Sequence, residues 1–201
     1  PTDYRVAFSE SQDGNIVRVD RVTFETISVR PQPAPGEAPL RWHWDTPLTL
    51  SPHDPKVIYA PANKVFRSAD RGLSWVAISP DLTSNTNRND VVTMGVKNSD
   101  TRIARNDGIS AWPTIVSFAE SPKRVGLLYV GTDDGRLVVS RDAGKTWTQV
   151  IDNVPGVPKG VFVSEVVPSR FDEATVYATF DGHRQNNFDT HVSVSNDYGQ
   201  T

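Results

Sequence analysis

Two short acidic segments hold the residues whose types and spacing could do chemistry. They are Asp-Asp-Gly at 133–135 and Asp-Gly-His-Arg at 181–184, and each directly follows a strand-like run. Hydrolysis of a glycosidic bond needs two carboxyl groups about 5 to 10 Å apart. Asp133, Asp134 and Asp181 are therefore the candidate catalytic residues. Asp-Gly is also a common tight turn between strands, and we favour that interpretation.

The histidine and arginine of the second segment are candidates for binding a ligand. His183 and Arg184 follow the Asp-Gly turn, and His191 lies eight residues beyond His183. This histidine spacing matches no familiar metal-ligand pattern, so we expect no metal site. No phosphate-binding glycine loop or other cofactor motif is present, and we expect no cofactor.

A pair of indoles gives a further candidate ligand surface. Trp42 and Trp44 lie in the segment 41–45 and would share one face of a strand. Paired indoles could stack on sugar rings. Burial is the commoner fate of such large side chains, so we favour packing between neighbouring structural units.

Three more aspartates belong to a repeated pattern, Ser-x-Asp-x-Gly-x-Ser/Thr-Trp. Its residues are Ser68, Asp70, Gly72 and Trp75; then Ser140, Asp142, Gly144 and Trp147; then Ser195, Asp197 and Gly199. Ser and Asp side chains can bond nearby backbone N–H groups, glycine permits positive φ, and Trp anchors the outgoing strand. We therefore interpret these aspartates as turn fasteners. Catalysis and calcium binding are the alternatives, but no Asp-x-Asp-x-Asp-Gly run is present.

The elements around the pattern repeat as well. A strand-like run lies on each side of every copy, and upstream a serine precedes a tyrosine by eight residues at 51 and 59, at 121 and 129, and at 169 and 177. Each unit thus reads as four antiparallel strands joined by turns. Repeated four-stranded units are typical of the blades of a β-propeller, so we predict an all-β fold that forms part of one.

The spacing of the copies divides the chain. We predict a degenerate blade at 1–30, a Pro-rich connection with an entry strand at 31–45, and blades with the motif at 46–82, 112–156 and 157–201, the last lacking its final strand. Residues 83–111 form an inserted loop, because the first two copies lie 72 residues apart and the next two only 55.

These motifs resemble a known family. The repeated pattern is similar to the Asp box, or BNR repeat, of sialidases, sortilin-type Vps10 domains and several glycoside hydrolases. The phrases WDTPLTLSPHDP (44–55), WVAISPDLT (75–83), VGTDDG (130–135) and FDGHR (180–184) resemble large exported bacterial Vps10/sortilin-like proteins, often labelled glycosyl hydrolases. The resemblance implies a propeller, a secreted or periplasmic location and a ligand-binding surface. A sialidase would also need three clustered arginines, and no spacing here selects such a triad.

Composition narrows the function classes. The net charge is −3, and without a basic stretch nucleic acid is not an expected partner. The absence of cysteine excludes disulfides and thiolate metal sites. No apolar run reaches the roughly eighteen residues that a membrane span requires.

The function expected from the sequence is binding. We predict a non-enzymatic scaffold propeller that recognises protein, peptide or glycan, with a glycoside hydrolase acting on a polysaccharide as the alternative. Three clear units and one degenerate unit cannot close a ring of six to ten blades. We therefore expect a fragment of a larger propeller protein, with the remainder of that protein or an assembly partner beside it.

Overall fold

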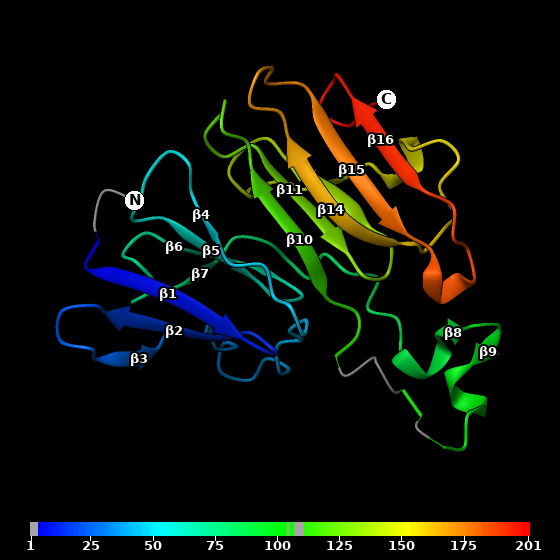
Figure 1. Ribbon diagram of the computed structural model, residues 1–201, viewed down its shortest axis with the longest axis horizontal. Coiled ribbons are helices and arrows are strands. Elements are labelled where there is room, and N and C mark those ends of the chain that lie inside the picture. Colours follow the sequence, from blue (N-terminus) through cyan, green and yellow to red (C-terminus); the bar gives the residue numbers. More distant parts are fainter. Residues whose placement is uncertain (1–3, 104, 107–110) are drawn as a thin grey trace.

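The computed structural model describes residues 4–103, 105–106 and 111–201. Three residues of the predicted first blade and five of the predicted insertion lie outside this part. Over the described residues the chain is all-β, as predicted, with antiparallel sheets joined in chain order (Figure 1). None of these sheets closes on itself, and no helix in the described ranges is long and apolar enough to cross a membrane.

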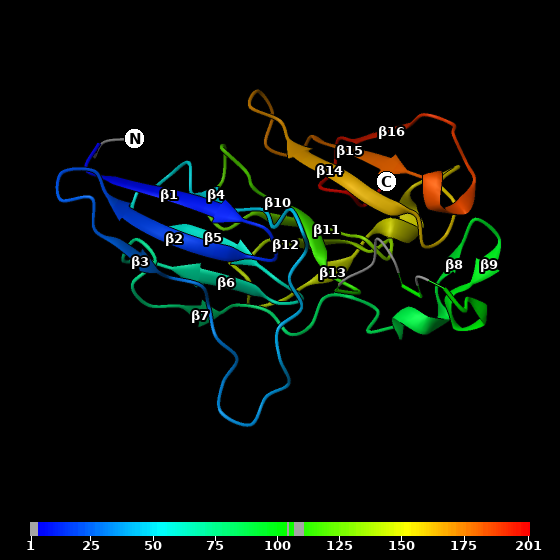
Figure 2. The same cartoon turned by 60° about the horizontal axis from the view of Figure 1, so that its bottom comes forward.

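Two of the sheets form one half of the molecule. The first has the order β1 (Val6–Ser11), β2 (Asn15–Asp20), β3 (Thr26–Ser28). The second has the order β4 (Thr49–Leu50), β5 (Ile58–Pro61), β6 (Val65–Ser68), β7 (Val76–Ala77). Figure 2 shows these two sheets stacked against each other.

The other two large sheets lie beside each other in the second half. The third has the order β10 (Ile115–Glu120), β11 (Leu128–Thr132), β12 (Leu137–Ser140), β13 (Thr148–Gln149), followed by η3 (Ile151–Asn153). The fourth has the order β14 (Phe162–Pro168), β15 (Val176–Asp181), β16 (His191–Ser195), with η4 (His183–Gln185) after β15.

The predicted inserted loop contains structure of its own. Its elements are η1 (Arg88–Asp90), the hairpin β8 (Val92–Thr93) with β9 (Val96–Lys97), and η2 (Asn98–Asp100). Figure 1 shows this small unit at the end of the fourth sheet, beside η4. Met94 donates its backbone N–H to the carbonyl oxygen of Arg184 at 3.0 Å, which attaches the hairpin to η4.

Three separate apolar cores lie between successive sheets. Ile16, Val29, Trp42, Ala60 and Ala62 form the core between the first and second sheets. Val57, Tyr59, Val65, Phe118 and Val130 belong to the core between the second and third. Leu127, Val139, Val163, Val166 and Phe180 belong to the core between the third and fourth. Burying apolar area is the main favourable term in folding, so each sheet depends on its neighbour.

The repeated motif closes a turn by bonds within itself. Asp70 accepts hydrogen bonds from the backbone N–H of Ser74 at 2.9 Å, from the Ser74 hydroxyl at 2.6 Å and from the Ser68 hydroxyl at 2.7 Å. These bonds, those from Ser74 first, lower the pKa of Asp70 to about 2. Gly72 has φ of +82°, a conformation that glycine adopts without strain. The carboxylate is thus held charged inside its own turn.

The motif tryptophans also join neighbouring sheets. Trp75 donates its indole N–H to the carbonyl oxygen of Val29 at 2.7 Å, and Trp147 donates to that of Ile78 at 3.0 Å. Val29 directly follows β3 and Ile78 directly follows β7, so each bond reaches the end of the last strand of the preceding sheet. At Gly144 a Cβ would lie 2.6 Å from the Ile78 oxygen, so only glycine fits this close approach.

Two local expectations need correction. The segment 41–45 was expected to be a strand with both indoles on one face, but it is an irregular connection, in which Trp42 is 3 % exposed and Trp44 is 50 % exposed. The closing strand of the first blade was expected over 24–29, but it begins only at Thr26, because the backbone N–H of Phe24 bonds to the Asp20 carbonyl in a turn where Phe24 has φ of +60°.

We predict that Trp75→Phe lowers the free energy of unfolding by about 1 to 3 kcal/mol, because the Val29 carbonyl loses its donor and the indole slot is underfilled. Chemical denaturation measures the change. Trp44→Phe is the matched control, since Trp44 is half exposed and its indole makes no hydrogen bond within the described residues. We expect it to change stability by less than about 0.5 kcal/mol. Equal losses in the two variants would contradict this role of Trp75.

Candidate functional site

The inserted segment and the third and fourth sheets enclose an open pocket of about 480 Å³. It lies at the opposite end of β12 from the repeated turn. Its lining residues are Ser84, Thr86, Val91, Val92, Gly95, Trp112, Asp133, Asp134, Gly160, Phe162, Asp181, Arg184 and Gln185. Residues about a hundred positions apart in the chain thus meet at one site.

Asp133 forms the floor of the pocket and is almost fully buried, at 3 % exposure. One carboxylate oxygen accepts the backbone N–H of Thr114 at 2.8 Å, and the other accepts the Thr114 hydroxyl at 2.6 Å. Burial raises the pKa of Asp133 to about 7, although these two bonds act in the opposite direction. The Asp133 carboxyl group in the pocket lining therefore keeps its proton at pH values below about 7.

Asp134 forms part of the wall towards the insertion. One of its oxygens accepts the backbone N–H of Ser84 at 2.6 Å, and the other accepts the Thr132 hydroxyl. The first bond connects the β11–β12 turn to the start of the inserted segment. Asp134 therefore both lines the pocket and holds one wall in place.

Asp181 is the most accessible carboxylate of the pocket, with 46 % of its side chain exposed. Its Oδ1 atom accepts the backbone N–H of His183 at 2.9 Å and also contacts the His183 ring nitrogen. The bond from the backbone N–H of His183 is the main cause that lowers the pKa of Asp181. No bond to its second oxygen, Oδ2, occurs within the described residues, so this oxygen can accept from a ligand.

Arg184 supplies the positive charge of the pocket. Its guanidinium lies 5.5 Å from the ring centroid of Trp112 and 5.5 Å from that of Phe162, within cation–π range of both. Among the residues that the structure describes, no hydrogen bond or ion pair reaches this guanidinium. The two aromatic rings therefore hold the group, while the carboxylates of Asp133 and Asp181 act on its charge without bonding it directly within the described residues.

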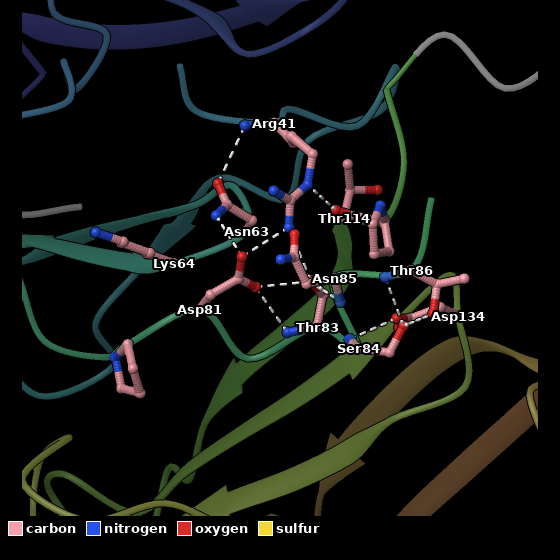
Figure 3. Close-up of polar contacts among 12 residues, drawn as sticks. Arg41, Asn63, Lys64, Asp81, Thr83, Ser84, Asn85, Thr86, Thr114 and Asp134 are labelled. Atoms are coloured by element: carbon pink, nitrogen blue, oxygen red, sulfur yellow. Dashed lines mark hydrogen bonds and ion pairs between the residues drawn. The ribbon is translucent and has the colours of Figure 1, made fainter. Parts of the chain in front are cut away.

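A polar network positions the insertion and thereby the pocket wall (Figure 3). Arg41 donates to Asp81 at 2.7 Å, to the Thr83 hydroxyl at 2.9 Å and to the Pro113 carbonyl at 2.9 Å. Thr83 donates its backbone N–H to Asp81 at 3.0 Å, and Asn63 donates to the same carboxylate at 2.9 Å. Both ends of the inserted segment are thus tied to one arginine.

The electrostatics of this network favour a charged carboxylate. Burial alone would raise the pKa of Asp81, but hydrogen bonds from Thr83, Asn63 and Arg41 outweigh it, and the pKa is lowered. In Figure 3 the next residue, Ser84, lies beside Asp134. The network therefore continues through Ser84 to the lining of the pocket.

The structure brings four of the candidates from the sequence together. Asp133, Asp134, Asp181 and Arg184 all line the pocket, whereas His183 contacts Asp181 from outside the lining. The two indoles of the segment 41–45 lie elsewhere: Trp42 packs with its ring centroid 6.5 Å from that of Phe66. Its burial leaves no free face for a sugar ring. Trp44 is exposed but is not part of this pocket.

Sequence reasoning missed the aromatic half of the site. Trp112 follows the insertion, and Phe162 begins β14, where its type reads simply as that of a strand residue. Neither belongs to a motif. Their positions could have pointed to them, because each aromatic residue lies at or just before the first strand of a predicted blade.

Comparisons with known proteins inform the fold. No protein-family model matches the chain, and no curated protein matches it. Among solved structures, the GH74 enzyme of Niastella koreensis is similar, with 18 % identity and a TM-score of 0.57 over 98 % of this chain and 27 % of that one. The GH74 xyloglucanase of Xanthomonas campestris has 18 % identity and a TM-score of 0.51 over 96 % and 34 %.

A third similar structure is the extracellular domain of BT4673 from B. thetaiotaomicron, described as a one-component system. It has 12 % identity and a TM-score of 0.53 over 94 % of this chain and 20 % of that one. The neighbours are β-propeller proteins, so the chain has the fold of part of a propeller. It spans about a third or less of each of the three.

We predict a pH dependence that originates at Asp133. Its folded-state pKa of about 7 lies above the ordinary value of 3.8, so the folded protein holds the proton more tightly than the unfolded chain does. The stability gained is full below about pH 4 and is lost as the pH rises to about 7. Relative to Asp133→Asn, the wild type should therefore lose stability across this interval.

Denaturant titrations of both proteins at several pH values across that interval measure the difference. Because the variant differs only at one position, the other titrating groups cancel in the comparison. A stability difference that is the same at every pH, or that grows as the pH rises, would contradict the raised pKa of Asp133.

Proposed function

We propose that this chain belongs to a binding protein whose ligand occupies the pocket between the inserted segment and the third and fourth sheets. Protein, peptide and glycan are the ligand classes that such a site can serve. Binding residues on loops above a stiff scaffold are a common arrangement, and here the three inter-sheet cores supply the scaffold.

The observation that carries the proposal is the state of the pocket carboxylates. Both oxygens of Asp133 are bonded to Thr114, and both oxygens of Asp134 are bonded to Ser84 and Thr132. Groups committed to holding the backbone are poorly placed to exchange protons with a substrate. The guanidinium of Arg184 and one oxygen of Asp181 make no hydrogen bond within the described residues, so they are suited to recognising a ligand.

Glycoside hydrolysis is the second candidate function, and one observation favours it. A carboxyl group with a raised pKa next to one that remains charged is the arrangement of an acid and its partner in glycosidases. Asp133 and Asp181 have pKa values shifted in these opposite directions. The burial of Asp133 argues against direct contact with a substrate. GH74 enzymes among the structural neighbours keep this candidate open for testing.

Location and partners form part of the same proposal. We infer that the protein acts outside the cytoplasm, because the sequence resembles exported proteins and one structural neighbour is an extracellular domain. The stretch that these structural neighbours share with this chain makes up only 20 to 34 % of their own length, which supports a place within a larger propeller protein or beside an assembly partner.

We predict that Arg184→Gln weakens ligand binding at least tenfold, because the pocket loses its only lining cation within the described residues. Arrays of glycans and of peptides identify the ligand, and calorimetry measures the affinity. Arg170→Gln is the matched control, since Arg170 is exposed in the turn before β15, at the far end of the fourth sheet from η4. This control should bind as the wild type does.

The same samples test the second candidate. Release of new reducing ends from a bound glycan, lost in Asp133→Asn and in Asp181→Asn, would replace binding by hydrolysis as the function. Equal affinity of the Arg184→Gln variant and the wild type would remove the pocket as the ligand site.

A further inference from the structure

We propose that the pocket selects an uncharged, hydroxyl-rich ligand, namely a segment of a neutral oligosaccharide. This inference rests on the proposed binding function and names its ligand class. It is argued from the hydrogen-bonding groups, the charges and the apolar surfaces that meet in the pocket.

Acceptors line two sides of the pocket. Asp134 on the insertion side keeps a second lone pair on each bonded oxygen, and Asp181 has Oδ2 free of bonds within the described residues. Both carboxylates can accept hydrogen bonds from ligand O–H groups. Such bonds are charge-assisted and therefore stronger than those between neutral groups.

A donor lies in the same pocket. The guanidinium of Arg184 carries five N–H donors and no acceptor, and no hydrogen bond to it is found in the described parts of the chain. One of its nitrogens, Nη1, is buried against protein. The remaining donors can reach ligand oxygens. A ligand that fits must accordingly donate to the carboxylates and accept from the guanidinium.

Apolar surface covers much of the rest of the lining. Trp112, Phe162, Val91 and Val92 contribute it, and Val92 is 52 % exposed. Sugar rings carry C–H groups on their faces and hydroxyls around their edges. The mixture of apolar walls with a few placed polar groups matches that pattern.

Charge decides between neutral and ionic ligands. A ligand carboxylate attracted to Arg184 would also approach the charges of Asp134 and Asp181, while a ligand ammonium attracted to those two would approach Arg184. Either repulsion weakens the binding of a charged ligand at this site. A hydroxyl avoids both, because it donates to a carboxylate and accepts from a guanidinium. Lysine-rich and acidic peptides are disfavoured for the same reason.

Three probe sets of similar length test this selection: neutral gluco- and xylo-oligosaccharides, oligogalacturonides as acidic probes, and chitosan oligomers as cationic probes. Calorimetry with the wild-type chain should detect a neutral oligosaccharide at least tenfold tighter than the other two sets. Arg184→Gln should weaken that binding at least tenfold, and Arg170→Gln should leave it unchanged.

Asp181→Asn tests the charge argument directly. The amide keeps an acceptor oxygen, so neutral binding should stay within about tenfold of the wild type, while the preference for neutral over acidic probes should shrink. Thermal unfolding of each variant shows whether it is folded. Tighter binding of an acidic or cationic probe or of a peptide, still lost in Arg184→Gln, would overturn this inference and leave the proposed function standing. Binding of none of these probes, and of nothing on the glycan and peptide arrays, would overturn both.

Discussion

Apolar packing between successive sheets is the interaction on which the rest of the structure depends. A short antiparallel sheet of two- to seven-residue strands cannot bury enough apolar area alone. Trp75 and Trp147 place a large apolar ring against the preceding sheet and fix its orientation with one hydrogen bond to a backbone carbonyl. The aspartate of each motif holds the turn from which that ring projects. Stacking in this manner leaves the opposite ends of the sheets free to carry a site.

The pocket depends on that stacking in a second way. Its acidic residues lie in the turns after β11 and β15, and its aromatic residues at the entries to β10 and β14. These segments meet because the third and fourth sheets pack against each other through a shared apolar core. Arg41 lies in the segment between the first and second sheets and bonds to Asp81, Thr83 and Pro113. Both ends of the insertion are therefore held in place.

The chemistry of the pocket follows from how its charges are partnered. Asp133 is buried and bonded to Thr114, and its proton is held up to near-neutral pH. Arg184 is placed by two aromatic rings, and no hydrogen bond or direct ion pair reaches its guanidinium among the described residues. Charges of both signs thus lie in one pocket, each held by its own set of contacts.

Local sequence determined the units and their turns. The Ser and Asp side chains of each motif bond to neighbours at most four residues away, and apolar and β-branched runs indicate strands without any knowledge of the fold. The acidic turns were visible for the same reason. Sequence alone did not show that Asp133, Asp134, Asp181 and Arg184 share one pocket, that Trp112 and Phe162 complete it, or that Trp44 is exposed while Trp42 is buried. Those facts depend on contacts between residues tens of positions apart, and only the packing of one sheet on the next decides them.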